Sequence, residues 1–263
     1  MKKILILLLI LLSLSGCSNT DNKANESVSN NSQEVTESKE SSEDYMVFQK
    51  ESDHFKFYSF NKDNQVIDDL TKELEGNYER ITDTYKTYPE EKFDVYIYSD
   101  VESFHESLDL TNAPGWVVSS FMNYKEIHIV SPSNPGEHHD YDSILKAAFN
   151  SFTRAIIKRI NSNLPKWLSL GIPQYERQIK IKFPEGFKED NIPELTELES
   201  PSSIEISTFY ISYTVVEFIV DKYGYDTLIE LIKKPDNYEE IFGFNKVEFE
   251  KKWRDYIIDK YLK

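Results

Sequence analysis

Residues 143–176 constrain the fold of this chain more than any other segment. Apolar side chains recur there at spacings of three and four residues, at Leu145, Ala148, Phe149, Phe152, Ile156 and Ile160. This spacing predicts an amphipathic α-helix whose single apolar stripe must be covered by other parts of the protein. The sequence Pro-Lys-Trp-Leu at residues 165–168 then predicts a turn and the start of a second helix.

This segment resembles the active-site region of gluzincin-type zinc metallopeptidases, the peptidase-MA-like family. In that family one helix carries the motif H-E-x-x-H, and the next helix opens with W-L-x-E-G. The first motif corresponds here to residues 150–154 (NSFTR) and the second to residues 167–171 (WLSLG). The resemblance implies an α+β fold, in which a small N-terminal sheet with helices is followed by a mainly helical C-terminal half.

The residues that would carry the family's chemistry are replaced in this chain. Its two zinc-binding His correspond to Asn150 and Arg154, its catalytic Glu to Ser151, and its third ligand to Leu170. Catalytic zinc needs three protein ligands, and hydrolysis needs a base that activates the bound water. Arg154 also places a positive charge where the metal would bind. We therefore expect a pseudopeptidase that keeps the fold but binds no metal or other cofactor.

The resemblance extends well beyond the two motifs. The matching pieces are VYIYSDVESFH, APGWVV, IHIVSPSNPG and SILKAA before the first motif, and SYTVVEFIVDKYG, LIELIKK and FEKKWRDYI after the second. Tyr213, in the first of the later pieces, matches a Tyr that recurs in the family's C-terminal helix. Because all these pieces follow the family's order, the resemblance implies one peptidase-MA-like domain over residues 45–263.

Local patterns predict the elements that precede the central helix. Alternating apolar residues indicate strands, and apolar spacing with an N-terminal cap at Asp100 indicates helices. The predicted elements are strands at 54–60 and 93–98, helices at 64–88 and 101–110, antiparallel strands at 115–121 and 126–130, and a loop at 131–141.

The N-terminus has the pattern of a bacterial lipoprotein signal peptide. Lys2 and Lys3 precede an apolar run that is too short to span a bilayer, and small residues follow. Residues 14–17 (LSGC) resemble the lipobox, which implies removal of residues 1–16 and a diacylglyceryl group on the Cys17 thiol. The alternative is a generic signal peptide with an incidental cysteine. We expect a protein anchored to the extracytoplasmic face of a bacterial membrane.

Residues 17–44 are predicted to form a disordered, lipid-anchored tether, because they contain almost no apolar side chains with which to form a core. The chain as a whole has a formal net charge of −16. Such a charge argues against nucleic acid as a partner and against adsorption to anionic lipid.

Asn150 and Arg154 lie four residues apart, so they share one face of the central helix. They are candidates for a polar clamp in which Arg154 pairs with a carboxylate or phosphate of a ligand. In the alternative, Arg154 pairs with an internal Asp or Glu. Tyr175 and Tyr213 are further candidates for lining the cleft, and core packing is the alternative for both.

The sequence is compatible with three functions. The first is a binding module whose cleft holds a peptide or protein segment. The second is a hydrolase with non-standard catalytic residues or an atypical metal site, for which residues 137–142 (EHHDYD) supply His138 and His139. The third is a structural envelope lipoprotein with a vestigial cleft. His128 is expected to occupy an exposed strand position.

Overall fold

The computed structural model describes residues 45–110, 112–199 and 206–263. The chain divides into two units, Met1–Ser41 and Ser42–Lys263, and the described residues all lie in the second unit. The predictions of a signal peptide, a lipidated Cys17 and a tether therefore fall outside the described residues.

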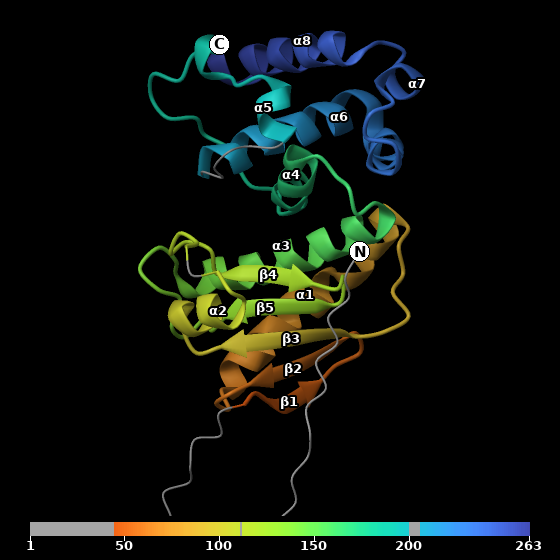
Figure 1. The fold of residues 1–263 in the computed structure, drawn as a ribbon. Coiled ribbons are helices and arrows are strands. Elements are labelled where there is room, and N and C mark those ends of the chain that lie inside the picture. The colour runs from red at the N-terminus through yellow and green to blue at the C-terminus, as the bar shows by residue number, and fades with distance from the viewer. Residues whose placement is uncertain (1–44, 111, 200–205) are drawn as a thin grey trace, which may run out of the picture. The chain divides into compact units, whose positions relative to one another are not determined.

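One sheet holds the strands of the described residues: β1 (Val47–Glu51), β2 (Phe55–Ser59), β3 (Phe93–Tyr98), β4 (Ser119–Met122) and β5 (Glu126–Val130). Their order in the sheet is β1-β2-β3-β5-β4 (Figure 1). β2, β3 and β5 are parallel, whereas β1 and β4 are antiparallel edge strands. The sequence predicted these strands except β1, whose residues show no clean alternation of buried and exposed positions.

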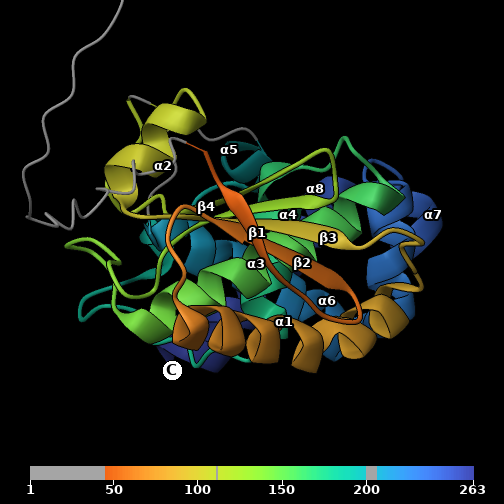
Figure 2. The same ribbon diagram turned by 90° about the horizontal axis from the view of Figure 1, so that it is seen from below.

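Two long helices, α1 (Asn64–Tyr85) and α3 (Tyr141–Ile160), cover one face of the sheet (Figure 2). Alternate residues of β2 and β3 point toward them, which buries Phe55 and Phe93 completely. Both rings meet the ring of Phe152 from α3 edge-on, at centroid distances of 5.6 and 5.3 Å. The apolar stripe predicted for the central helix is thus covered by aromatic side chains of the sheet.

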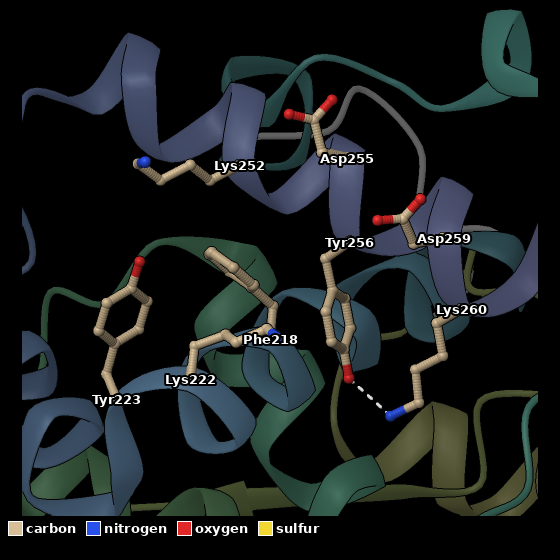
Figure 3. Close-up of a pocket in the computed structure, with 8 residues that line it drawn as sticks. All are labelled: Phe218, Lys222, Tyr223, Lys252, Asp255, Tyr256, Asp259 and Lys260. Carbon is tan, nitrogen blue, oxygen red and sulfur yellow. Dashed lines mark hydrogen bonds between the residues drawn. The ribbon is translucent and has the colours of Figure 1, made fainter.

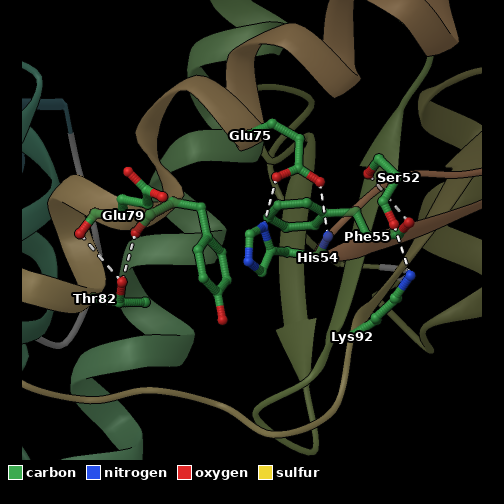
Figure 4. Close-up of polar contacts among 8 residues, drawn as sticks. Ser52, His54, Phe55, Glu75, Glu79, Thr82 and Lys92 are labelled. Carbon is green, nitrogen blue, oxygen red and sulfur yellow. Dashed lines mark hydrogen bonds and ion pairs between the residues drawn. The ribbon is translucent and has the colours of Figure 1, made fainter.

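Figure 4 shows how the start of β2 is fastened to α1. The Glu75 carboxylate accepts a hydrogen bond from the backbone N–H of His54 at 2.8 Å and contacts the His54 ring at 2.7 Å. The same ring stacks on Tyr78, with 3.5 Å between ring centroids. These contacts fix the end of the sheet against the helix.

His128 is buried, so the prediction of an exposed position is wrong. Only 7% of the residue is exposed, because the parallel register pairs it with Tyr96 and stacks the two rings. The Tyr98 hydroxyl contacts its Nδ1 at 2.9 Å. Burial lowers the pKa of the imidazole, and the nearby Glu126 carboxylate opposes that shift. The alternation within one strand does not reveal which side chains a neighbouring strand supplies.

The second half is mainly helical, and this confirms the predicted α+β class. The elements that follow α3 are α4 (Lys166–Glu176), η1 (Glu189–Asn191), α5 (Leu195–Glu199), α6 (Ile206–Lys233), α7 (Tyr238–Phe242), α8 (Lys246–Ile257) and η2 (Ile258–Leu262). A short helix of the first half, α2 (Val101–Ser107), lies beside the sheet.

Helix α4 packs against both α3 and α6. Gly171 permits the α6 contact: a Cβ atom at this position would lie 2.6 Å from the Ser212 carbonyl carbon and still closer to its oxygen. The end of α4 is fastened to α1, because Arg80 and Tyr85 donate hydrogen bonds to the buried Glu176 carboxylate.

Replacing Gly171 with Ala should therefore destabilise the protein. The new methyl group overlaps backbone that cannot rotate away, so we expect a loss of about 2–3 kcal/mol in the free energy of unfolding. Gly76→Ala is the matched control: it lies in α1 with no atom near the new methyl group, and should gain about 1 kcal/mol. Denaturant unfolding of both variants measures the difference, and equal stability of the two would contradict this packing.

Candidate functional site

The four positions aligned with the metallopeptidase motifs line a single cavity. Asn150, Ser151 and Arg154 reach it from α3, and Leu170 reaches it from α4. Its volume is about 470 Å³. The other lining residues are Trp116, Val117, Val118, Ser119, His138, His139, Ala147, Pro173, Gln174, Arg177, Phe209 and Tyr210. We call this cavity the α3–α4 cleft.

Arg154 has no ion-pair partner within the described part of the chain. Its guanidinium lies over the Phe121 ring at 5.0 Å, and its Nε is buried without a hydrogen-bond acceptor. Burial lowers the pKa of Arg154 to about 10, which leaves the group cationic at neutral pH. The sequence left open that Arg154 pairs with an internal Asp or Glu, and no such pair occurs among the residues that the structure describes.

Asn150 and Ser151 differ in how their polar atoms are used. The Asn150 Oδ1 is buried and accepts no hydrogen bond from any residue that the structure describes. Ser151 is only 1% exposed, and its hydroxyl donates to the Ser119 Oγ at 3.1 Å. Ser119 in turn donates to the Ala147 carbonyl, also at 3.1 Å. Ser151 therefore ties α3 to β4, and its proton is not directed at a base.

The ionisable side chains that line the cleft, among the described residues, are two Arg, two His and Tyr210, and none of them is a carboxylate. This is unusual in a chain of net charge −16. Burial lowers the pKa of Arg177 as well. Burial, and then the positive charge of Arg154, lowers the pKa values of Lys158 and Lys166. A positive potential therefore surrounds Arg154, and it favours an anionic ligand.

The edge strand β4 begins at the cleft. The Val118 carbonyl accepts a hydrogen bond from the Val130 N–H at 3.0 Å, which makes this a hydrogen-bonded pair of the β4–β5 ladder. Pairs alternate in an antiparallel ladder, so Ser119 and Phe121 direct their N–H and C=O groups away from β5. These groups lie at the open edge of the sheet, where another strand can add.

His138 and His139 border the cleft from the loop before α3. His139 contacts the Trp116 carbonyl through Nε2 at 2.9 Å and the Ser143 hydroxyl through Nδ1 at 3.2 Å. Asp140 caps α3 through the Ser143 N–H. No group of three or more His, Cys, Asp or Glu arranged to hold a metal ion occurs in residues 45–110, 112–199 and 206–263.

Tyr175 and Tyr213 lie in a different cavity, of about 520 Å³, which the largely buried Glu176 and Glu217 also line. The Tyr213 hydroxyl donates to Glu217 at 3.0 Å, and the two Tyr rings are 5.7 Å apart. The structure therefore brings Asn150 and Arg154 together but separates them from both tyrosines.

A larger cavity, of about 590 Å³, lies between α6 and α8 (Figure 3). Its charged groups, except the exposed Lys222, already have partners. Lys260 pairs with Glu217 and Asp221 and contacts the Tyr256 hydroxyl, and Lys252 pairs with Glu248. The α3–α4 cleft is the better candidate site because the partly buried Arg154 has no such partner among the described residues.

Arg177 was not identified from the sequence, and neither was the packing of Trp116 on Phe209. Arg177 comes seven residues after Leu170, and this spacing places both residues on one helical face. The helix periodicity could therefore have identified Arg177 as a residue that lines the cleft. Trp116 meets Phe209 edge-on at 6.0 Å, a contact between segments far apart in the chain that no local pattern contains.

Comparison with known proteins identifies the type of segment at the N-terminus. Residues 1–18 match the family model of the prokaryotic membrane lipoprotein lipid attachment site. No curated protein matches the chain. In the described part of the chain, no helix has the length and apolar character needed to cross a membrane. The chain therefore carries the lipid attachment site of a bacterial, membrane-anchored lipoprotein.

Proposed function

We propose that this lipoprotein is anchored to the outer face of the cell membrane through a lipid on Cys17, and that its domain, residues 45–263, binds a peptide segment in the α3–α4 cleft. The observation that carries the proposal is the cation Arg154, which has no ionic partner among the described residues and lines an open cleft beside an edge strand.

The walls of the cleft fit an extended peptide. The N–H and C=O groups of Ser119 and Phe121 at the open edge are available for a β-ladder with the ligand. Trp116 and Phe209 supply apolar surface for its side chains. The cavity volume lies within the range of ligand pockets, roughly 300–1,000 Å³.

A metallopeptidase-like origin without peptidase activity is also part of this proposal. It is supported by the meeting of all four aligned positions in one cavity. Leu170 supplies no ligand atom, Arg154 repels a metal ion, and Ser151 is engaged with Ser119. The open, cationic cleft favours ligand binding over a vestigial cleft filled by apolar side chains.

Blocking the strand edge should weaken peptide binding. Ser119→Pro removes an outward N–H but no bond to β5, a position at which edge strands tolerate proline. We expect roughly tenfold weaker binding, the equivalent of about 1.4 kcal/mol. The measurement is retention of a randomised nonapeptide pool on the immobilised, detergent-purified full chain.

Ser119→Ala is the matched variant, because it removes the hydroxyl but keeps the N–H. It should retain the peptides far better than Ser119→Pro. Equal loss in both variants, with fold retained by circular dichroism, would argue against strand addition at this edge.

Cys17→Ser should release the protein from the membrane, because the serine hydroxyl cannot take the thioether-linked lipid. We expect the wild-type chain in the membrane fraction and the variant in the soluble or secreted fraction of the producing bacterium. A variant that stays with the membrane, processed and stable, would exclude Cys17 as the anchor.

A further inference from the structure

We infer that the α3–α4 cleft receives the free carboxyl terminus of its peptide ligand, whose carboxylate pairs with Arg154 while its last backbone N–H donates to Asn150. This inference rests on the proposed function and names the chemical class of the ligand.

The first support is the state of the Arg154 guanidinium. A guanidinium has five N–H donors in one plane. The Cζ of Arg154 lies 5.0 Å from the centroid of the Phe121 ring, and this ring offers no oxygen or nitrogen acceptor to the donors. The Nε is buried, and nothing in the described residues accepts its hydrogen. A carboxylate approaching in the plane can accept two parallel hydrogen bonds, which is the arrangement that a guanidinium favours.

The second support is Asn150, one helical turn before Arg154. Its buried Oδ1 needs a donor, and the described residues supply none. The terminal residue of a peptide carries an N–H donor and a carboxylate on the same Cα atom. Such a residue satisfies Asn150 and Arg154 together. An inorganic phosphate dianion or a phospholipid phosphodiester offers the negative charge but not the N–H donor.

The third support is the apolar surface beside these two residues. Trp116 and Phe209 form an edge-on pair, and Leu170 is almost fully buried next to them. These groups favour a last residue with an apolar or aromatic side chain. The open edge of β4 starts in the same cleft and can pair with the preceding residues of the ligand.

The unpaired charge has a cost in the free protein. A partly desolvated cation without an anion is destabilising, and removal of its charge at similar volume relieves that cost. The charge of Arg154 therefore lowers the stability of the free protein, and pairing with a ligand carboxylate restores that stability. Binding sites commonly show this trade-off between stability and function.

The test compares peptides that differ only at the carboxyl terminus. Nonapeptides retained from the pool are synthesised as free acids and as amides, and isothermal titration gives the Kd of each for the full chain. For the wild type we expect amidation to weaken binding at least tenfold. For Arg154→Gln we expect the acid and the amide to bind alike. Arg159→Gln, a control on the same helix whose wild-type arginine pairs with Glu91, should keep the wild-type ratio.

Two results would overturn the inference but leave the proposed function intact. One is equal binding of acid and amide to the wild type. The other is tight binding of amidated peptides through an internal Asp or Glu, which would assign Arg154 to an acidic side chain. Failure of every peptide to bind would instead remove the proposed function itself.

Arg154→Met separates a binding role from a structural one. It keeps the volume of the side chain but removes its charge, so the midpoint of thermal unfolding should rise while the preference for the free acid disappears. A lower midpoint would mean that Arg154 serves an internal anion, and this would also overturn the inference.

Discussion

The close crossing of α4 and α6 at Gly171 is the contact on which the candidate site depends. Because no side chain separates the helices there, α4 packs against both α3 and α6 and brings Leu170 to the cavity that Asn150 and Arg154 line. The same crossing places Phe209 of α6 at the rim of the cleft. A wider separation would move two walls of the cavity at once.

The charges that line the cleft decide which class of ligand this arrangement of helices favours. A metallopeptidase cleft concentrates ligands for a cation, whereas this one contains the cation Arg154, which is the basis for proposing an anionic ligand. Arg154 is held in place by packing on Phe121, without an ionic partner in the described residues. The proposed binding site is therefore organised in the free protein, an arrangement that in general lowers the entropic cost of binding.

The sequence predicted those features that depend on local periodicity. The strands β2, β3 and β5, the helices α1 and α3, and the shared face of Asn150 and Arg154 follow from the spacing of apolar residues. It did not predict β1, the burial of His128, or the separation of Tyr175 from Arg154. Each of these depends on which segment packs beside another, and a pattern within one segment does not contain that information.

The most direct measurement of the central claim is zinc binding by a variant that carries Asn150→His, Ser151→Glu, Arg154→His and Leu170→Glu. If the cleft has the geometry of a lost zinc site, the folded variant binds one zinc ion per chain, which a chelator removes, while the wild-type chain binds none after the same dialysis. A folded variant that takes up no zinc would contradict the account, and so would stoichiometric zinc in the wild type.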